Sequence, residues 1–360
     1  MNLLNETNAR VALKGVSLRK TCPLTVIIPA YNEGKSLADT VKSVLKQTVA
    51  VQEIIVVDDC STDNTGQVVL DLGVKVLRPP QNTGSKAGAQ NYALQVTNSE
   101  LTMAIDADTV LAEDAIEKLL EAFDDGKVAA ACGFVIPRYV NTLWERGRYI
   151  EYLFAFTFFK PIQDYYDKPL ISSGCFSMYR TDILKGNGGW STRTLAEDMD
   201  LTWSFYQSGH KVRFIGDAVC YPIEPHSFLF MRKQLKRWCH GFVQNVQLHW
   251  RNIVHIKYLR SMVTVSLWDA VVASFVYLIL LPLLAIAFRN PVFLIGYIID
   301  VPAVLIPTVA VAIKRKEILR VLTSLPAFFV LRTVNGIFML EAIVSEWVFK
   351  KSFRVYEKGH

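Results

Sequence analysis

Between residues 25 and 221, short apolar runs alternate with polar, turn-rich segments. Leu24–Pro29 and Glu53–Val57 are rich in β-branched residues and bounded by turn residues, and Lys35–Gln47 between them has helical spacing. This succession predicts a β-α-β unit. Because the pattern repeats, we expect an α/β fold with a mostly parallel sheet. The further elements expected are strands at Lys75–Leu77 and Leu101–Ile105 and helices at Ser85–Val96 and Ala112–Phe123.

The pattern changes after about Ser261, where charged residues become rare. Ala270–Phe288 runs for 19 residues without a charge, close to the ~20 that a helix needs to cross the hydrocarbon core of a bilayer. Pro291–Ile313 is a second candidate span. A third, about Val321–Phe349, carries Arg332, Glu341 and Glu346, which are expensive in lipid unless they face protein or a watery path. We expect about three spans, of which the third either crosses or lies partly at the interface.

The amino-terminal stretch Met1–Cys22 is polar and basic and lacks the apolar core of a secretory signal. We therefore expect an integral protein of the cell membrane with a cytoplasmic catalytic part, an unused sequon at Asn5, and reduced cysteines without disulfides or zinc. With three spans, basic residues at the carboxyl end would lie outside, against the usual bias. These residues are Lys350, Lys351, Arg354 and Lys358.

The composition adds a constraint on partners. The chain has 360 residues, of which 51% are hydrophobic, and a net charge of +6, with basic pairs at Arg232-Lys233 and Lys236-Arg237. Basic clusters are also found in nucleic-acid-binding proteins. Beside apolar spans, they are better explained by the anionic cytoplasmic leaflet, so we expect the lipid bilayer as a partner and no nucleic acid.

Residues 143–166 mix aromatic and basic side chains and predict an interfacial amphipathic helix. The alternative is a buried helix of the domain core. The organisation expected from these patterns is a polar segment 1–23, a catalytic domain 24–221 that includes helix 143–166, a helical region 222–260, a transmembrane region 261–349 and a basic tail 350–360.

Polar clusters follow successive predicted strands: Tyr31-Asn32-Glu33, Asp58-Asp59 and Asp106-Ala107-Asp108. Asn and Asp commonly cap helices and form turns, so one such cluster alone indicates little. In open α/β sheets, however, ligands bind outside the carboxyl ends of the strands. Three clusters at those ends therefore predict a ligand site.

Asp106 and Asp108 point to the same side if the strand persists, and their carboxylates suit Mg²⁺ or Mn²⁺ bound to a diphosphate. The predicted helix start at Gly84-Ser85-Lys86 offers backbone N–H groups and one ammonium to phosphate. Glu197-Asp198 opens an amphipathic stretch. A carboxylate there is either favoured by a helix amino terminus or acts as a general base.

Gln234, Arg237 and Trp238 are spaced to share one face of a helix over Phe228–Trp250. Arginine supplies a fork of donors for phosphate, and tryptophan supplies a flat apolar surface for a sugar ring. A basic amphipathic helix on a membrane surface has the same composition. We expect this helix to serve both purposes.

Together these segments resemble the family 2 inverting glycosyltransferases, and the last of them resembles the processive polysaccharide synthases of hyaluronan, chitin, cellulose and poly-N-acetylglucosamine. The resemblance covers about Leu24 to Trp250. Many such synthases have spans before the catalytic domain, which this chain lacks, so we expect protomers to associate, a small membrane subunit to contribute helices, or no polymer to be exported. The matching motifs are Val26–Glu33, Val57–Asp63, Asp106–Asp108, Ser173–Ser177, Ala196–Asp198 and Gln234–Trp238.

The resemblance implies a GT-A (Rossmann-like) fold and a metal-dependent transfer of sugar from UDP to the hydroxyl of a growing β-linked glycan, with inversion. It implies Asp198 as the base and Asp108 as the metal ligand. Alternatives are transfer of one sugar to a polyprenyl phosphate, glycolipid or protein, and a non-catalytic subunit of an export complex. The resemblance assigns the nucleotide and donor to Ala30, Glu33, Asp59, Lys86, Asp106, Gln234 and Arg237, and the acceptor to Gly174, Cys175, Glu197 and Trp238.

Overall fold

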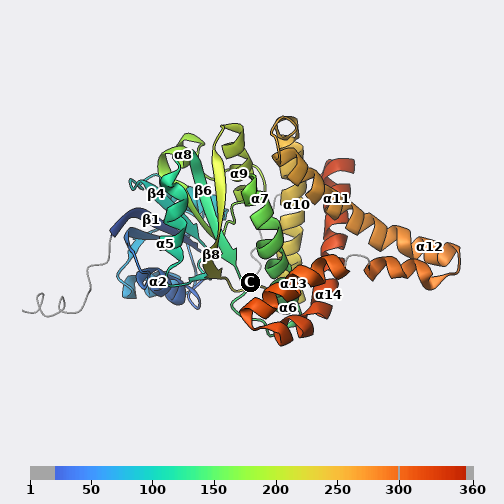
Figure 1. The fold of residues 1–360 in the computed structure, drawn as a ribbon. Helices are drawn as coiled ribbons and strands as arrows, with labels where there is room; N and C mark the ends of the chain where they lie inside the picture. The colour runs from blue at the N-terminus through green and yellow to red at the C-terminus, as the bar shows by residue number, and fades with distance from the viewer. Residues whose placement is uncertain (1–20, 299–300, 354–360) are drawn as a thin grey trace, which may run out of the picture.

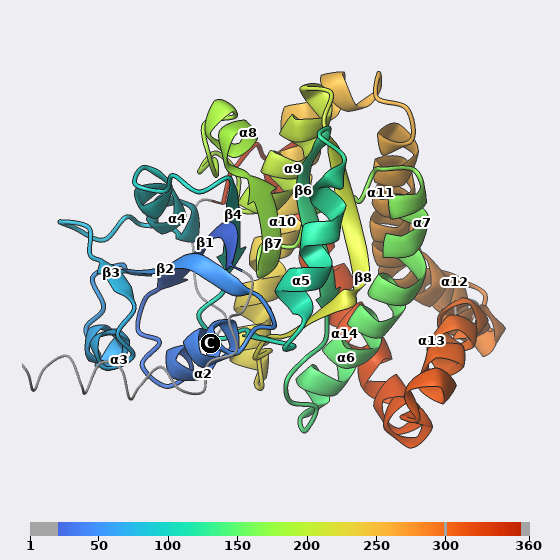
Figure 2. The ribbon, with the colours of Figure 1, turned by 60° about the vertical axis from the view of Figure 1, so that its left-hand side comes forward.

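The computed structural model describes residues 21–298 and 301–353, and it consists of one mixed sheet with helices on its faces and a helical region at one end (Figure 1). Three predictions concern residues outside the described ranges: the unused sequon at Asn5, the lack of a signal sequence in the amino-terminal stretch, and the position of the tail residues Arg354 and Lys358. Figures 1 and 2 both show the carboxyl-terminal helices at the end of the sheet away from β3. The sheet has eight strands in the order β3-β2-β1-β4-β7-β6-β8-β5.

The elements predicted up to residue 124 are confirmed. The strands predicted at Lys75–Leu77 and Leu101–Ile105 form β3 and β4 with those bounds. The other elements of this part are β1 (Thr21–Ala30), α2 (Leu37–Leu45), β2 (Ala50–Asp58), α4 (Lys86–Leu94), α5 (Ala115–Leu120) and the 3₁₀-helix Glu121–Asp124.

The order β3-β2-β1-β4 places a topological switch point between β1 and β4. These two strands are parallel neighbours, and β1 is also parallel to β2 on its other side. The helix-containing connections after β1 and after β4 leave toward opposite sides of such a point, which opens a crevice at the carboxyl ends of the strands. The crevice lies where β1 ends at Ala30, β2 at Asp58 and β4 at Ile105.

The second half of the sheet departs from the parallel pattern. β7 (Phe176–Arg180) is antiparallel to both β4 and β6, while β6 and β8 are parallel to each other. The sheet is therefore mixed, and the expectation of a mostly parallel sheet holds only for its first half. Elements that the sequence did not predict are α3 (Thr65–Asp71), β5 (Val110–Leu111), β6 (Val128–Val135), α8 (Thr181–Gly186) and β8 (Lys211–Tyr221).

Residues 143–165 form α6 (Leu143–Phe154), a π-helical turn (Ala155–Phe159) and α7 (Lys160–Tyr165). A capping box fixes the start of α6, because Thr142 accepts from the backbone of Glu145 while the Glu145 carboxylate accepts from the backbone of Thr142. One face of α6 is buried, and aromatic residues of the following turns are exposed. The buried face agrees with a helix of the domain core, and the interfacial placement stays a prediction. The exposed side chains are Phe158, Phe159, Ile162 and Tyr165.

Two further helices bring the predicted catalytic motifs together. α9 (Glu197–Gln207) packs beside the long α10 (Phe228–Ile253). The buried Asp200 of α9 accepts from His249 of α10 at 2.6 Å and forms an ion pair with Arg193 at 2.7 Å. Burial opposes ionisation of Asp200, but the hydrogen bonds from His249 and Arg193 lower its pKa to about 2. This ionised carboxylate fixes α9 against α10.

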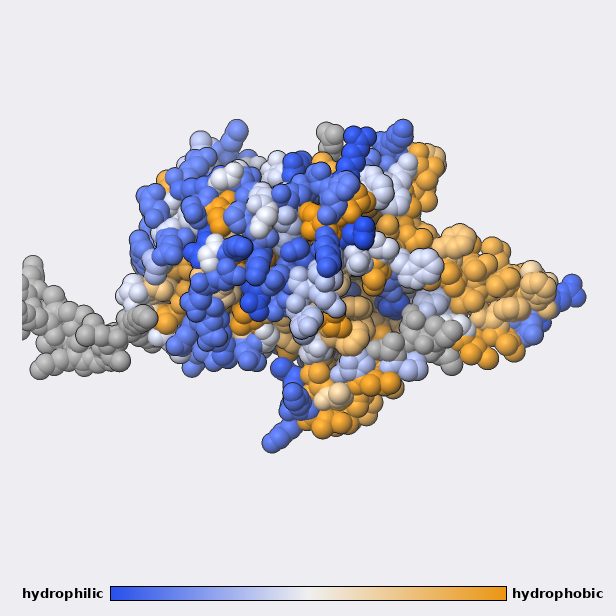
Figure 3. Space-filling model, turned by 45° about the horizontal axis from the view of Figure 1, so that its top comes forward, coloured by the Kyte–Doolittle hydropathy of each residue, from blue (hydrophilic) through white to orange (hydrophobic). Residues whose placement is uncertain are grey.

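The carboxyl-terminal region contains an apolar arm, the helical segment Leu259–Ala287, which Figure 3 shows as part of a hydrophobic projection. In the described residues, two helices are long and apolar enough to cross a membrane: Leu259–Ala287 and Ile318–Val348. The expected span at residues 291–313 forms instead a 3₁₀-helix (Pro291–Ile298) and the 15-residue α13 (Val301–Arg315), which contains Pro307. At 1.5 Å per residue α13 is about 22 Å long, too short to cross alone.

The third apolar stretch forms α14 (Ile318–Ile343) and a π-helical turn (Val344–Val348), which pack along the catalytic domain. At the start, Tyr149 donates to Glu317 at 2.9 Å, and near the end His240 lies 2.8 Å from Glu346. Lys236 pairs with Glu341, and Arg332 pairs with Asp269. The charges that would be costly in lipid are therefore each paired within the protein.

Cys60 has a strained backbone at the end of the crevice. It lies directly after Asp59 and has a φ of 62°, in the left-handed region, although it carries a side chain. Replacing it with glycine removes about 1–2 kcal/mol of steric strain, part of which is offset by the greater freedom of glycine in the unfolded chain, so Cys60→Gly should raise the unfolding temperature of the purified protein by about 1 °C.

The matched control is Cys60→Ala, which removes the thiol but keeps the Cβ atom and the strain. We expect no gain in thermal stability for this variant. An equal gain in both variants would show that the thiol, not the backbone, is the source of the effect.

Candidate active site

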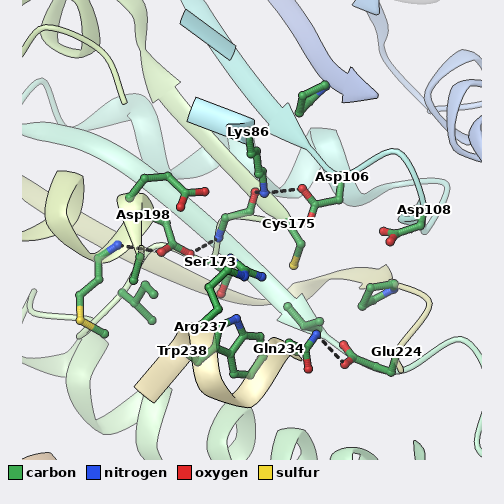
Figure 4. A pocket seen from close by; sticks show the side chains of 18 of the residues that line it. Lys86, Asp106, Asp108, Ser173, Cys175, Asp198, Glu224, Gln234, Arg237 and Trp238 are labelled. Carbon is green, nitrogen blue, oxygen red and sulfur yellow. Dashed lines mark hydrogen bonds and ion pairs between the residues drawn. The ribbon is translucent and has the colours of Figure 1, made fainter. Parts of the chain in front are cut away.

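A single cavity of about 680 Å³ opens at the carboxyl ends of β1, β2 and β4 and extends between α9 and α10 (Figure 4). The structure brings every site residue predicted from the sequence to this cavity, although the roles of these residues stay predictions. The residues are Ala30, Glu33, Asp59, Lys86, Asp106, Asp108, Gly174, Cys175, Glu197, Asp198, Gln234, Arg237 and Trp238.

The end of the cavity beside β1 and β2 is held by Asp59. Its carboxylate accepts from the backbone N–H and the hydroxyl of Thr83 at 2.8 and 2.9 Å, and its own N–H donates to the carbonyl of Ala30 at 2.9 Å. Nearby, the buried Glu33 accepts a hydrogen bond from Ser36 at 2.6 Å. This end is thus a polar recess built from β1, β2 and the loop before α4.

Lys86 joins that recess to the middle of the cavity. Ser85 caps α4 by accepting from the N–H of Gly88, which places Lys86 in the first turn. The Lys86 ammonium forms an ion pair with Asp106 and donates to the carbonyl of Gly174 at 2.9 Å. One cation therefore ties together three segments that lie far apart in the sequence.

Asp106 and Asp108 lie in the turn after β4, which ends at Ile105. The strand does not persist, so the argument that alternation along a strand aligns the two carboxylates was wrong, even though both line the cavity. Burial raises the pKa of Asp106, the nearby Asp108 raises it further, and Lys86 and Arg237 oppose the change.

The two carboxylates fit a hard divalent cation that also binds phosphate. Hard cations of this kind prefer oxygen ligands, and Mg²⁺ usually keeps several waters and binds through one or two carboxylates and substrate phosphates. Over residues 21–298 and 301–353, no group of three His, Cys, Asp or Glu side chains is arranged to hold a metal. A cation at Asp108 would therefore depend on the ligand for part of its coordination.

Asp198 lies in the first turn of α9, and both of its carboxylate oxygens accept backbone hydrogen bonds. The donors are Gly174 at 2.8 Å and Met199 at 2.9 Å. A Cβ atom at residue 174 would come within 2.8 Å of the Asp198 carboxylate, so this approach requires glycine. Both interpretations of Asp198 fit: a helix amino terminus stabilises the charge, and the side chain faces the cavity.

Glu197, the neighbour of Asp198, is a second acidic residue of the cavity wall. Burial raises the pKa of Glu197, and the adjacent Asp198 raises it further, while Lys86 and Arg237 oppose the change.

Gln234, Arg237 and Trp238 share the cavity face of α10, as their spacing predicted. Figure 4 shows Arg237 and Trp238 between Asp198 and Gln234. Gln234 approaches the buried Glu224, with 3.5 Å between its amide nitrogen and the carboxylate. This face supplies a guanidinium, an amide and an aromatic ring to the same space as the carboxylates.

Sequence reasoning missed Arg148 and Glu224. Arg148 has no exposed surface and lies behind the cavity wall, where it contacts Gln234 and Trp238. Glu224 lines the cavity, and burial raises its pKa while Arg148 opposes the change. No local motif indicates either residue, because Arg148 resembles the other basic residues of an amphipathic helix and Glu224 lies in a loop.

A solved structure of similar fold is the mannosyltransferase PcManGT from Pyrobaculum calidifontis, in complex with GDP-Man and Mn²⁺. The match has a TM-score of 0.61 at 19% sequence identity and covers 96% of this chain and 94% of that one. At this identity the likeness concerns the fold alone, and it confirms the expected glycosyltransferase-like α/β domain.

Curated relatives are similar in sequence as well. The poly-beta-1,6-N-acetyl-D-glucosamine synthase of Staphylococcus epidermidis strain ATCC 35984 is 28% identical over 223 residues, and that of Staphylococcus aureus strain COL is 26% identical over 222 residues. Each match covers 61% of this chain and 54% of the relative. The chain thus spans about half the length of the curated relatives it matches.

The family model described as glycosyl transferase family 2 matches residues 25–188, which contain β1 to β4, the two carboxylates after β4 and the loop before β7. This match agrees with the relatives and with the motifs identified in the sequence. The chain therefore carries a glycosyltransferase family 2 domain and resembles the poly-beta-1,6-N-acetyl-D-glucosamine synthases.

Proposed function

We propose that the protein is a membrane-integrated inverting glycosyltransferase that transfers a sugar from a UDP-sugar to a hydroxyl of a growing β-linked glycan. The observation that carries this proposal is the convergence of a fixed carboxylate, Asp198, with Asp108 and Arg237 on one cavity. A sugar transfer needs a proton acceptor, charge neutralisation for a diphosphate and room for two sugars. The side chains of the cavity supply the proton acceptor and the neutralising charge, and its volume supplies room for two sugars.

The nucleotide would lie at the recess of Asp59 and Glu33, against the carbonyl edge of Ala30. Carboxylate oxygens accept hydrogen bonds from a nucleobase N–H, which suits the imide of uracil. The diphosphate would extend toward Lys86 and Arg237. The solved mannosyltransferase of similar fold is complexed with a sugar nucleotide, GDP-Man, which supports this class of donor.

In the proposed reaction, Asp198 accepts the proton of the acceptor hydroxyl, whose oxygen attacks the anomeric carbon as the bond to the diphosphate breaks. Gln234, Arg237 and Lys86 hold the departing diphosphate, since fixed donors stabilise charge as it develops. Trp238 lies under the acceptor sugar. One displacement inverts the anomeric carbon, so an α-linked donor gives a β-linked product.

The proposed metal is Mg²⁺ or Mn²⁺, held by Asp108 with Asp106 nearby. When bound, it would neutralise charge on the leaving diphosphate as a Lewis acid. The Mn²⁺ complex of the similar mannosyltransferase supports this assignment. The acceptor residues would be Gly174 and Cys175 on one wall, with Glu197 and Trp238 opposite.

We propose that the apolar arm of Leu259–Ala287 anchors the protein in the bilayer, with the catalytic domain on the cytoplasmic side. This helix is 29 residues long, and its most apolar stretch is almost entirely unburied. Lys257 and Arg260 at its start suit the anionic leaflet. Export of a long polymer would need helices from a second copy or a partner subunit, because the described residues supply only two candidate spans.

A second candidate function is the transfer of one sugar to a lipid-linked acceptor such as a polyprenyl phosphate. The observation that favours it is the extent of the cavity, which reaches Asn335 and Met339 of α14, a candidate membrane helix. An acceptor could enter from the lipid side there. A non-catalytic role as an export subunit is disfavoured by the retained carboxylates and Arg237.

Product length separates the two catalytic candidates. Purified protein in bilayers is incubated with each of several labelled UDP-sugars, with GDP-mannose as the alternative donor, and the products are sized after extraction into aqueous and organic phases. The proposal predicts a water-soluble ladder of β-linked products from one UDP-sugar. A single labelled lipid would favour the second candidate, and no transfer from any donor would overturn both.

Asp198→Asn keeps an acceptor oxygen for one of the two backbone hydrogen bonds but removes the proton acceptor. Transfer should fall by at least about 100-fold, the range for a general base, while UDP affinity stays within about twofold. Isothermal titration with UDP and a transfer assay measure the two quantities. Unchanged transfer would reject Asp198 as the base.

Asp108→Ala should weaken UDP binding by about tenfold or more in the presence of Mn²⁺, which is the size of effect typical of a damaged metal site. In excess chelator, wild type and variant should bind UDP equally weakly, since neither then holds a cation. Equal binding by the two proteins in Mn²⁺ would contradict the assignment of the metal ligand.

Gly174→Ala places a Cβ atom against the Asp198 carboxylate, whose oxygen lies 2.8 Å from the ideal position of that atom. A shift of about 1 Å in a catalytic group reduces rate by about 100-fold, and we expect a loss of this order in kcat. Gly186→Ala is the matched control, because nothing lies within 4 Å of its added methyl group. Equal activity of both variants would show that Asp198 is not held through residue 174.

A further inference from the structure

Arg148 is a buried cation that the proposed reaction does not use. It lies on α6, has no exposed surface, and is absent from the residues that line the cavity. It therefore cannot touch a substrate. A charge in such a place is costly unless it is paired and hydrogen-bonded, so its contacts indicate what it holds.

The Arg148 guanidinium contacts two residues of α10, Gln234 and Trp238. Its Nη2 donates to the Gln234 side-chain oxygen at 2.6 Å, and its Cζ lies 4.5 Å from the centroid of the Trp238 ring. The same Nη2 lies 3.2 Å from the Met231 sulfur. Gln234 and Trp238 line the cavity, and each contacts Arg148 on the side away from it.

Two carboxylates balance the charge. Arg148 forms an ion pair with Glu151 on its own helix, and its Nε lies 3.4 Å from Glu224 in the loop before α10. Burial works against the charged form of Arg148, but Glu151, Tyr152 and Glu224 outweigh it and raise the pKa above its usual range. The guanidinium is thus permanently charged and held between α6, α10 and the intervening loop.

A planar group is required at this position. The guanidinium presents a flat face to the indole while its edge donates to Gln234 and to Glu151 and lies beside Glu224, an arrangement that the tetrahedral ammonium of lysine cannot reproduce. The indole therefore has a cation over its ring and also lines the cavity. Its orientation depends on that stacking contact.

We propose that Arg148 is a positioning residue that fixes Trp238 for acceptor binding and holds Gln234 toward the departing diphosphate. This inference rests on the proposed transfer reaction, in which Trp238 lies under the acceptor sugar. It predicts that damage at Arg148 raises the acceptor KM through Trp238 and lowers kcat through Gln234, which acts on charge that develops as the diphosphate departs, while binding of the donor itself changes little. The nucleotide recess at Asp59 is built from other elements and is unaffected.

The first test uses Arg148→Lys, which keeps the charge and loses the plane. Loss of a hydrogen bond from a charged donor should raise the acceptor KM about tenfold, while the donor KM changes less than about twofold. Adding Trp238→Phe should remove most of this difference, because both changes act through one ring. Equal changes in the two KM values, or none, would overturn the proposal.

Two controls on the same helix separate positioning from general damage. Arg146→Lys makes the same exchange at an exposed residue and should leave both KM values unchanged. Ile150→Val weakens the buried face of α6 away from the cavity and should lower thermal stability without a split between the two KM values. The proposal would also be overturned if Ile150→Val raised the acceptor KM relative to the donor KM as much as Arg148→Lys does.

The second test needs no activity. The emission of Trp238 is isolated by subtracting the spectrum of the Trp238→Phe protein, in the wild-type and in the Arg148→Lys background. We expect a red-shifted Trp238 that acrylamide quenches more strongly in the variant. An identical difference spectrum would refute the role of Arg148, even if no transfer were found and the proposed function failed. If Arg148→Lys does not fold, Arg148→Gln replaces it, with the same expected changes.

Discussion

The cavity depends on a balance of charge among groups that are largely removed from water. Burial raises the pKa of Asp106, Glu197 and Glu224, so each of these carboxyl groups resists ionisation where it lies. Lys86 and Arg237 act in the opposite direction on the first two. Lys86 and Arg237 therefore stabilise the cavity itself, because without them its acidic walls would repel one another.

Much of the fold follows from local sequence, and the limits have physical causes. The elements around β1 to β4 were predictable because short apolar runs and turn residues alternate there. β7 runs against both its neighbours, and no local pattern specifies that direction. The prediction that Asp106 and Asp108 point to the same side relied on the strand continuing through them, but β4 ends at Ile105. Arg148 was missed because only tertiary packing distinguishes it from Arg146.

The membrane region shows the same division between composition and packing. Hydropathy identified the apolar arm and the α14 stretch, but it could not show that α14 packs along α6 and α10, with Glu317, Glu341 and Glu346 paired to those helices. The cavity reaches this helix at Asn335. The catalytic domain and α14 therefore pack as one unit, and the cavity extends to this candidate membrane helix.

The central claim is that one cavity holds the nucleotide, the metal and the base together. A crystal structure with UDP and Mn²⁺ tests it most directly, because manganese is located independently by its anomalous scattering. The account predicts an anomalous peak beside Asp108, uracil against Asp59, and the diphosphate at Arg237 with Asp198 facing its terminal phosphate. A nucleotide bound outside the cavity, or manganese remote from Asp108, would contradict it.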